Sequence, residues 1–401
     1  MKKRLIYYRT YLIIFLLILS VFFLSRCIDR NGNETLTEKT SVDTTAIRFE
    51  DFAGSSSCAG CHKDIYNSHV KTAHFLTSAE TSDIFVKGSF DTGKNKYAFN
   101  SSVAVKMEKR ADGYYQVEYF KDSVKKEKRM DIVVGSGTMG QSSLSWQDNR
   151  LFQMPMTYFS AAHQWSNSPG FPDRVVFNRV ITSRCLECHS TFAKTISAPG
   201  KEPEEFDRTK FIYGVDCEKC HGPATKHVQF QTEHPDDTTA KFIINPASFT
   251  RQQKLDLCAL CHGGRLQKIK PSFSFTAGDN LSDYFLTDTF PPRPELIDVH
   301  GNQYGLLRAS KCFKMSGMTC NTCHDVHENQ KGKIVQFSQK CMSCHGDLNT
   351  IGGVTHRRLG MQVKINCVDC HMPLQSSRAI SVFLPDAKVP TAAQIRSHFI
   401  K

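Results

Sequence analysis

The chain has 401 residues, of which 40% are hydrophobic and 22% are charged, so intrinsic disorder is excluded as a description of the whole chain. The length suits one large or two modest globular domains. The formal net charge of +12 does not indicate a nucleic-acid partner, because the first 26 residues contribute five basic side chains and no acid. The unusual feature is the content of sixteen Cys and sixteen His.

Residues 1–27 have the order of a secretory signal: a basic start, an apolar run over 11–24, and then Ser25-Arg26-Cys27. The fourteen residues of that run are fewer than the roughly 20 that cross a bilayer comfortably. The end of the segment resembles a bacterial lipobox, in which Cys27 is lipidated and becomes the mature N-terminus. The alternative is an uncleaved N-terminal anchor with an arginine near each end of the run.

Both alternatives predict that the protein lies on the periplasmic or outer face of the cell envelope and is attached to a membrane through its N-terminus. Residues 28–56 are rich in Asn, Thr, Ser, Asp and Glu, which is typical of a flexible tether. The folded domain is therefore expected over residues 57–401.

The pattern Cys-x-x-Cys-His occurs seven times, and its copies are called motifs 1 to 7 in chain order. They take up fourteen of the sixteen cysteines and leave Cys27 and Cys312, which excludes a disulfide scaffold. The motifs stand at 58–62, 185–189, 217–221, 258–262, 320–324, 341–345 and 367–371. Their cysteines are Cys58, Cys61, Cys185, Cys188, Cys217, Cys220, Cys258, Cys261, Cys320, Cys323, Cys341, Cys344, Cys367 and Cys370, and their histidines are His62, His189, His221, His262, His324, His345 and His371.

Cys-x-x-Cys-His is the attachment signature of c-type haem. The two thiols bond vinyl groups at one edge of the macrocycle, and the adjoining His reaches the iron as an axial ligand. Zinc ribbons and thioredoxin-like dithiols also use Cys-x-x-Cys, but neither has a reason to place His after each pair. The sequence therefore predicts seven covalently attached haem c groups. Export agrees with this prediction, because such haems are attached outside the cytoplasm.

The longest interval without a motif lies between motifs 1 and 2. Within it, three short runs rich in Val, Tyr and Phe, at 96–110, 114–120 and 129–134, are separated by residues that favour turns. The pattern predicts a small β-meander insert, within a β-rich stretch at about 90–180.

Elsewhere we expect short helices and long irregular connections, because the haems would fill much of the interior. The clearest predicted helix runs from Thr250 to Cys261, since it follows Asn245-Pro246 and stops at Gly263-Gly264. The predicted fold class is a mainly α and irregular multihaem cytochrome fold organised around covalent haems, with the small β-meander insert.

Each iron has a second axial position, where a histidine gives a low-spin electron-transfer site and a vacancy gives a place for a substrate. Nine histidines outside the motifs remain for seven such positions. His69 and His163 are open alternatives, and His234, in an acidic loop with a proline, is expected to be solvated. The expected second ligands are His74, His227, His300, His327, His356 and His398.

The segments around the motifs resemble the cytochrome c-554-like family, within the wider group of multihaem cytochromes that includes hydroxylamine oxidoreductase. The resemblance spans about residues 56–400 and rests on CAGCHKDIYNSHVKTAH at 58–74, WSNSPGFP followed by CLECHS at 165–190, GVDCEKCHGPATKH at 214–227, CALCHGGR at 258–265, MTCNTCHDVH at 318–327, CVDCHMP at 367–373 and IRSH at 395–398. It implies second axial ligands at His74, His227, His327 and His398. The family usually has Trp at the position of His69, which speaks against a ligand role for His69.

Two functions are compatible with these features. The first is an exported heptahaem electron carrier, whose mostly bis-His haems pass electrons between extracytoplasmic donor and acceptor proteins. The alternative is an enzyme, a multihaem oxidoreductase that acts on a small nitrogen or sulfur compound at one five-coordinate haem. The carrier is favoured because the sequence has no Cys-x-x-Cys-Lys, the mark of the catalytic haem in pentahaem nitrite reductases, and has histidines for every iron. The short intervals between motifs 5, 6 and 7 also predict that these haems are neighbours.

Overall fold

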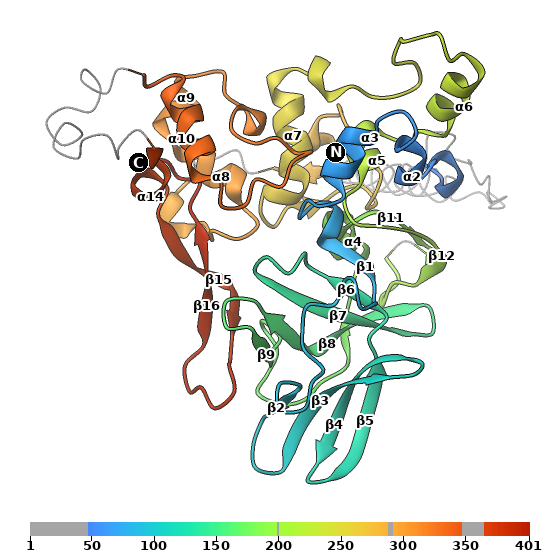
Figure 1. Cartoon of the computed structure of the whole chain (residues 1–401), viewed down its shortest axis with the longest axis vertical. Helices are drawn as coiled ribbons and strands as arrows, with labels where there is room; N and C mark the ends of the chain where they lie inside the picture. Colours follow the sequence, from blue (N-terminus) through green and yellow to red (C-terminus); the bar gives the residue numbers. More distant parts are fainter. Residues whose placement is uncertain (1–46, 199, 288–291, 347–364) are drawn as a thin grey trace, which may run out of the picture. The chain divides into compact units, whose positions relative to one another are not determined.

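Strands and helices contribute almost equally to the computed structural model, with 27% of residues in strands and 26% in helices (Figure 1). The structure describes residues 47–198, 200–287, 292–346 and 365–401. The predicted signal or anchor, including Cys27, lies outside these residues. In the part of the chain that is described, no helix combines the length and the apolar character needed to cross a bilayer.

Six strands form one antiparallel sheet. They are β1 (Ser78–Glu80), β6 (Ile132–Val134), β7 (Gly140–Gln147), β8 (Arg150–Phe159), β9 (Gln164–Asn167) and β10 (Arg179–Val180). The order is β1-β6-β7-β8-β10, and β9 also pairs with β8. The chain turns from β7 into β8 at Asp148, whose φ of 51° suits a tight hairpin turn. Leu144 and Leu151 pack with Ile132 in the core beneath this sheet.

A second sheet is a four-stranded meander in sequence order. Its strands are β2 (Lys96–Ala98), β3 (Val103–Arg110), β4 (Gly113–Phe120) and β5 (Ser123–Arg129). Gly113 and Lys121 take positive φ in the two turns, at 143° and 55°. Nearly all of β5 is exposed, and its lysines stand on an edge of the sheet, where such charges hinder pairing with another chain.

The prediction of a mainly α and irregular fold is wrong, because strands equal helices in extent and several sheets are present. Several strands that directly follow or flank motifs were not predicted, because polar and apolar residues do not alternate clearly in them. Pairing with a distant segment, rather than local propensity, decides the conformation there. The additional pairs are β11 (Ser190–Thr195) with β12 (Phe206–Tyr213), β13 (Gln267–Lys268) with β14 (Phe285–Leu286), and β15 (Leu374–Val382) with β16 (Thr391–Arg396).

The helices are short, and many of them carry a motif. They are α2 (Ser55–Cys58), α3 (Lys63–His69), α4 (Ser183–His189), α5 (Cys217–His221), α6 (Thr225–Glu233), α7 (Arg251–His262), α8 (Gln303–Ala309), α9 (Lys311–Lys314), α10 (Ile334–Met342) and α14 (Val368–His371), with 3-10 turns at η2 (Phe49–Asp51), η3 (Phe75–Thr77), η4 (Pro246–Ser248), η5 (Leu281–Asp283), η6 (Pro294–Leu296) and η7 (Cys320–Thr322).

The predicted helix from Thr250 to Cys261 is confirmed as α7. The Thr250 hydroxyl accepts a hydrogen bond from the Gln253 backbone, and the Gln253 side chain accepts one from the Thr250 backbone, which is a capping box. The helix ends at Gly263, as its sequence predicts.

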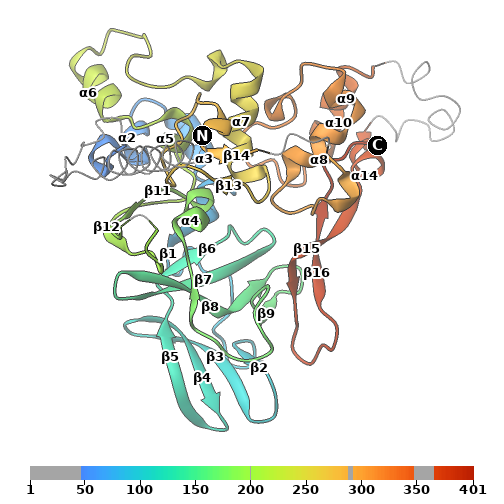
Figure 2. The same cartoon turned by 180° about the vertical axis from the view of Figure 1, so that it is seen from behind.

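Within residues 47–401, the two large sheets lie at one end and most of the motif-bearing helices at the other (Figures 1 and 2). The β15–β16 hairpin connects them, because it leaves α14 and packs Val382 and Ala393 against Phe159 of β8. Residues 47–56, at the end of the stretch expected as a tether, also contact the fold: the Phe52 ring lies 5.1 Å from that of Phe192 on β11.

Glu218, a variable residue of motif 3, ties this motif to the chain before motif 1. Its side chain is 2% exposed and its carboxylate accepts hydrogen bonds from the backbone N–H groups of Ala53 and Gly54, both at 2.8 Å. A third bond comes from the Ala224 N–H, also at 2.8 Å. Burial raises the pKa of Glu218 above its ordinary value. The carboxylate thus holds three segments together at one point.

Glu218→Ala is expected to lower the free energy of unfolding by about 2–4 kcal/mol, because three backbone donors lose their acceptor in a buried place. Urea denaturation followed by circular dichroism measures the change. Glu233→Ala on the exposed side of α6 is the matched control and should change the free energy by less than about 0.5 kcal/mol. Equal stabilities of the two variants would contradict the assigned role.

Candidate functional site

One large cavity brings all seven motifs together. Its volume is about 3500 Å³, several times the roughly 300–1,000 Å³ of an ordinary ligand pocket. The lining is mainly apolar, and it includes every cysteine and every histidine of the motifs. Protein interiors are close-packed, so an apolar space of this size fits large apolar groups attached within it.

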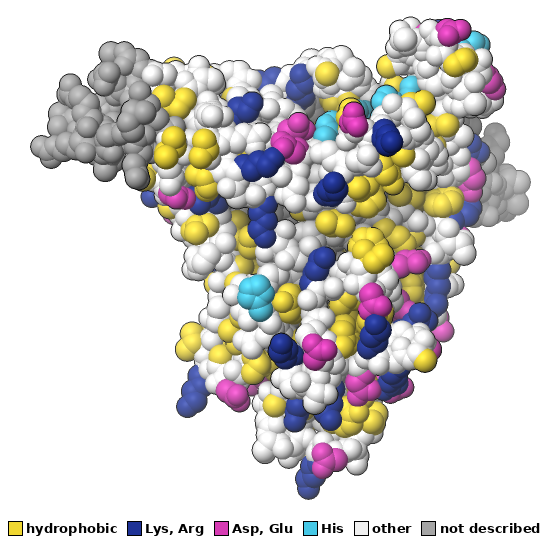
Figure 3. Space-filling view, viewed as in Figure 1, with side chains coloured by type: hydrophobic (Ala, Val, Ile, Leu, Met, Phe, Trp, Pro, Cys, Tyr) yellow, Lys and Arg dark blue, Asp and Glu magenta, His cyan; other side chains and the backbone are white. Residues whose placement is uncertain are grey.

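The cavity reaches the surface at its rim. Ile65 on α3 and Met315 after α9 both line it, and they are 51% and 78% exposed. Figure 3 shows hydrophobic side chains at the surface in the region of α3 and β11. Small molecules or a partner protein therefore have access to parts of this lining.

Helical turns arrange the reactive side chains within a motif. Residues three and four apart lie on the same face of a helix, so the two cysteines and the histidine of a motif share one face. The His62 N–H donates to the Cys58 carbonyl at 2.8 Å in motif 1, and His324 donates to Cys320 at 3.0 Å in motif 5. This spacing presents two thiols and one imidazole to the same side of the cavity.

Several motif histidines have their Nδ1 atom engaged by the protein. The Nδ1 of His221 lies 2.9 Å from the Ile244 carbonyl oxygen, and that of His371 lies 2.7 Å from the Lys401 carbonyl oxygen. In motif 4, the Nδ1 of His262 lies 3.2 Å from Oε1 of Gln303. A bond that holds the Nδ1–H fixes the ring and leaves Nε2 for a metal, as at most metal-binding histidines.

Three motif histidines face a histidine from elsewhere in the chain. Their ring centres are 6.1 Å apart for His262 and His74, 6.2 Å for His221 and His327, and 6.1 Å for His324 and His398. A metal held between two imidazoles, with metal–nitrogen bonds of about 2 Å, separates the ring centres by about 6 Å. These three pairs therefore fit motifs 4, 3 and 5 as sites with two histidine ligands.

The structure divides the histidines outside the motifs into two groups. His163 and His234 do not line the cavity: His163 is exposed in a turn with φ of 52°, and His234 stacks on Phe230 with ring centres 4.4 Å apart. His356 lies outside the described residues. The members that line the cavity are His69, His74, His227, His300, His327 and His398.

His69 is more prominent than the sequence indicated. It is 7% exposed, its Nε2 bonds the Val215 carbonyl oxygen at 3.1 Å, and its Nδ1 is buried without a hydrogen-bond partner. Its ring centre lies 6.1 Å from that of His327, the residue that also faces His221. The position in α3 just after motif 1 was the available signal, but the local pattern does not distinguish a ligand from a neighbour of a ligand.

Burial favours the uncharged form of several cavity histidines. It lowers the pKa of His74, His189 and His398 to about 4. The pKa values of His262, His300 and His324 shift in the same direction for the same reason. Neutral imidazole is the form that binds a metal, so the protein environment prepares these side chains for that role at neutral pH.

Thiols from different motifs lie beside one another in the cavity, which gives the order of the motifs in space. Motif 1 is next to motif 3, motif 2 next to motif 4, motif 4 next to motif 5, and motif 6 next to motif 7. Cys323 and Cys344 also interact electrostatically, so motifs 5 and 6 are neighbours as well. The neighbouring thiol pairs are Cys58 with Cys217, Cys188 with Cys261, Cys258 with Cys320, and Cys341 with Cys367.

Cys312, which belongs to no motif, also lines the cavity. Its thiol interacts electrostatically with those of Cys323 and Cys341. The expectation from the sequence left it as a spare thiol, and no local pattern would have placed it between motifs 5 and 6.

Comparison with known proteins agrees with these features. Residues 159–222, which contain motifs 2 and 3, match the family described as cytochrome c554 and c-prime. Residues 312–382, which contain motifs 5 to 7, match the family described as cytochrome c3. The fold is similar to the crystal structure of the outer cell wall cytochrome OcwA, with a TM-score of 0.51 and 16% identity over 88% of this chain and 80% of that chain. At this identity the likeness shows the fold alone. Among curated proteins, none matches the chain in sequence.

Proposed function

We propose that the chain, which is a multihaem c-type cytochrome, holds seven covalently attached haem c groups and transfers electrons between extracytoplasmic donor and acceptor proteins. Haem c supplies a one-electron iron couple, and histidine at both axial positions favours electron transfer over substrate binding. The seven motifs in one cavity supply the attachment thiols and the first axial imidazoles.

The observation that carries this proposal is the set of three facing histidine pairs. His74, His327 and His398 come from segments far from motifs 4, 3 and 5, and each lies opposite the motif histidine at 6.1–6.2 Å. A surface or packing role does not require this repeated spacing. It is the arrangement that low-spin electron-transfer sites need.

The order of the motifs supports a continuous path. Contacts between thiols join motif 4 to motif 5 and motif 6 to motif 7, and Cys323 joins motifs 5 and 6. Motif 2 meets motif 4, motif 1 meets motif 3, and the Cys220 and Cys258 thiols of motifs 3 and 4 interact electrostatically, which joins the two groups. Sites in such close contact allow electrons to move through the cavity without a mobile carrier.

One observation favours a second candidate, an oxidoreductase with an open iron site. The Nε2 of His69 bonds the Val215 carbonyl oxygen, and its ring lies beside that of His327, which already faces His221, so we do not assign His69 as a ligand. His227, His300 and His356 then remain for motifs 1, 2, 6 and 7, which is one donor fewer than the sites. A site without a second histidine would accept a small ligand.

A location outside the cytoplasm is part of the proposal. The fold resembles that of a protein named as an outer cell wall cytochrome, and c-type haems are attached outside the cytoplasm. We propose attachment through residues 1–27, either by a lipid on Cys27 or by an uncleaved anchor. Mass spectrometry of the mature N-terminus distinguishes the two.

The test is to count haems and their spin states in the purified, haem-loaded protein. The intact mass should show seven attached haems, and low-temperature EPR should show at least three low-spin ferric haems from the facing pairs. No change on adding nitrite, hydroxylamine or sulfite supports a dedicated carrier. A high-spin signal that shifts with one of these compounds supports the second candidate. Fewer than seven haems would contradict the proposed loading.

A further inference from the structure

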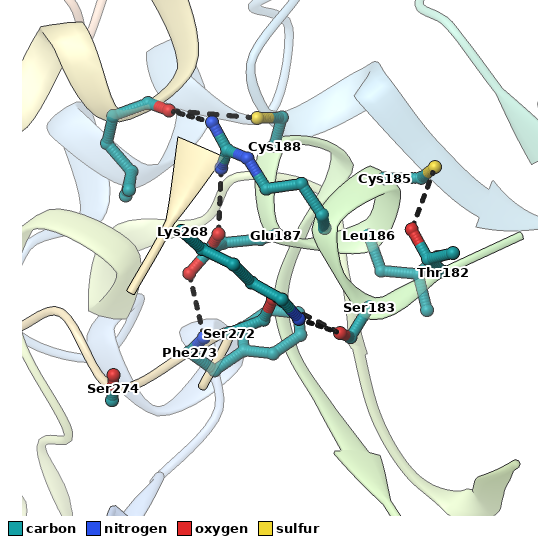
Figure 4. Close-up of polar contacts among 12 residues, drawn as sticks. Thr182, Ser183, Cys185, Leu186, Glu187, Cys188, Lys268, Ser272, Phe273 and Ser274 are labelled. Carbon is teal, nitrogen blue, oxygen red and sulfur yellow. Dashed lines mark hydrogen bonds and ion pairs between the residues drawn. The ribbon is translucent and has the colours of Figure 1, made fainter. Parts of the chain in front are cut away.

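Two opposite charges lie in α4, inside and just before motif 2. The Arg184 guanidinium Nη1 is 2.7 Å from Oε2 of Glu187. The other carboxylate oxygen, Oε1, accepts the backbone N–H of Phe273 at 2.8 Å. Figure 4 shows Glu187 pointing from α4 toward Phe273, with Cys188 beside it. The carboxylate therefore has a charged partner on one oxygen and a backbone donor on the other.

The same arginine reaches into motif 4. Its Nη2 donates to the Leu260 carbonyl oxygen at 2.8 Å, and Leu260 stands directly before Cys261. The guanidinium carbon lies 4.7 Å from the centre of the Phe285 ring, which covers it. Arg184 is thus a link between motif 2, where it is bonded to Glu187, and the backbone of motif 4.

Burial makes this pair unusual among the ion pairs of the described residues. The Glu187 side chain is 1% exposed and that of Arg184 is 22% exposed. Moving two charges out of water costs more free energy than the attraction within an isolated pair returns. A buried ion pair is therefore weak evidence for a purely stabilising role. Charges in a poorly screened interior act strongly on any neighbouring charge.

The neighbouring thiols are those of motifs 2 and 4. The Cys188 sulfur lies 3.9 Å from the Leu260 carbonyl oxygen, the atom that also accepts a hydrogen bond from Arg184. Cys188 also lies beside Cys261. The fixed charges of Arg184 and Glu187 are therefore next to the attachment points of two proposed haems.

We propose that Arg184 and Glu187 are positioning residues that join motif 2 to motif 4 and set the reduction potential of the motif 2 haem through their opposite charges. This inference rests on the proposed haem loading. A positive charge nearby stabilises the reduced iron, which carries one charge less, and so raises the potential. A negative charge has the opposite effect.

The test is a potentiometric titration of the haem-loaded Arg184→Gln and Glu187→Gln variants. In Arg184→Gln, one component of the titration is expected to move to lower potential, and in Glu187→Gln the same component is expected to move to higher potential. We expect about a tenfold change in the reduction equilibrium of that component in each case, which is about 59 mV for a one-electron couple. Both variants should also be less stable in urea.

Potential shifts of opposite sign in Arg184→Gln and Glu187→Gln would distinguish an electrostatic role from a structural one. Loosening of the fold would lower stability in both variants without giving shifts of opposite sign. Arg184→Lys keeps the charge but not both hydrogen bonds, so it should keep the potential while losing stability. If Arg184→Gln fails to load haem, the Lys variant and Glu187→Gln still test the proposal.

The matched control is the ion pair between Arg150 and Glu205, which has the same 2.7 Å contact but is more exposed, at 39% and 25%, and stands outside the motifs. Arg150→Gln and Glu205→Gln should leave every component in place. Shifts of the same sign in Arg184→Gln and Glu187→Gln, or no shift in either, overturn the inference. Haem content is measured first: a wild-type protein with fewer than seven haems refutes the proposed loading, whereas full loading without the shifts refutes only the role of these two residues.

Discussion

Replacing His327 by alanine should convert one low-spin ferric haem of the loaded protein into a high-spin haem. His327 faces His221 of motif 3 with ring centres 6.2 Å apart, and no other described histidine lies opposite His221. The vacant axial position would then admit water or an added ligand. Low-temperature EPR and the optical spectrum measure the change, and added imidazole should restore the low-spin signal.

His163→Ala and His234→Ala are the controls, because neither residue lines the cavity. Both should leave the number of low-spin haems unchanged. His327→Met should keep the site low-spin and raise its potential, since a methionine ligand stabilises the reduced iron. A low-spin count in His327→Ala equal to that of the wild type would contradict the assigned pair.

Protein produced without haem attachment should lose the structure around the cavity while keeping the two large sheets. The cavity of about 3500 Å³ has an apolar lining that cannot remain unfilled in a packed fold, so the motif-bearing helices have little to pack against. The core with Val105, Met107 and Met156 lies within the sheets and has no residue in the cavity lining. That core does not need the haems.

Limited proteolysis with mass spectrometry measures this difference. The haem-free chain should yield a protected fragment close to residues 78–181, with rapid cleavage from α5 to α14. Expression of the same chain in cells with and without the haem attachment system provides the comparison, and Cys312→Ser, outside the motifs, serves as a control for loss of a thiol. Equal protection of α5 to α14 in both forms would refute the dependence.

The cysteines and histidines of the motifs can be predicted from local sequence patterns, whereas the second axial ligands depend on the tertiary fold. Each Cys-x-x-Cys-His needs only one helical turn to present its side chains together. Which histidine faces which motif depends on contacts between distant segments, as for His74 and His262. The sequence therefore predicted second ligands such as His74 and His398 but did not predict which motif each one faces.

The strands also show that elements which depend on pairing with a distant segment are not predicted from local sequence. The β3–β4 hairpin has Val on both sides of its turn and Tyr in β4, and the sequence predicted it. The third predicted run, at 129–134, contains β6 of the other sheet, whereas β5, which is rich in lysine, was not predicted. β15 reads as a polar segment with many exposed residues, and it becomes a strand because β16 pairs with it. The roles of Glu187 and Glu218 could not be predicted either, because the Cys-x-x-Cys-His pattern allows any residue at their positions.

The proposed ligand pairs also imply an order in which the haem sites receive their second ligand during export. A chain that leaves the membrane from its N-terminus presents His74 before motif 4, so that site can close as soon as its motif emerges. His327 and His398 follow motifs 3 and 5, so those sites stay open until later segments arrive and long loops close. Nascent chains would therefore bind small ligands such as cyanide that the finished protein excludes from these two positions.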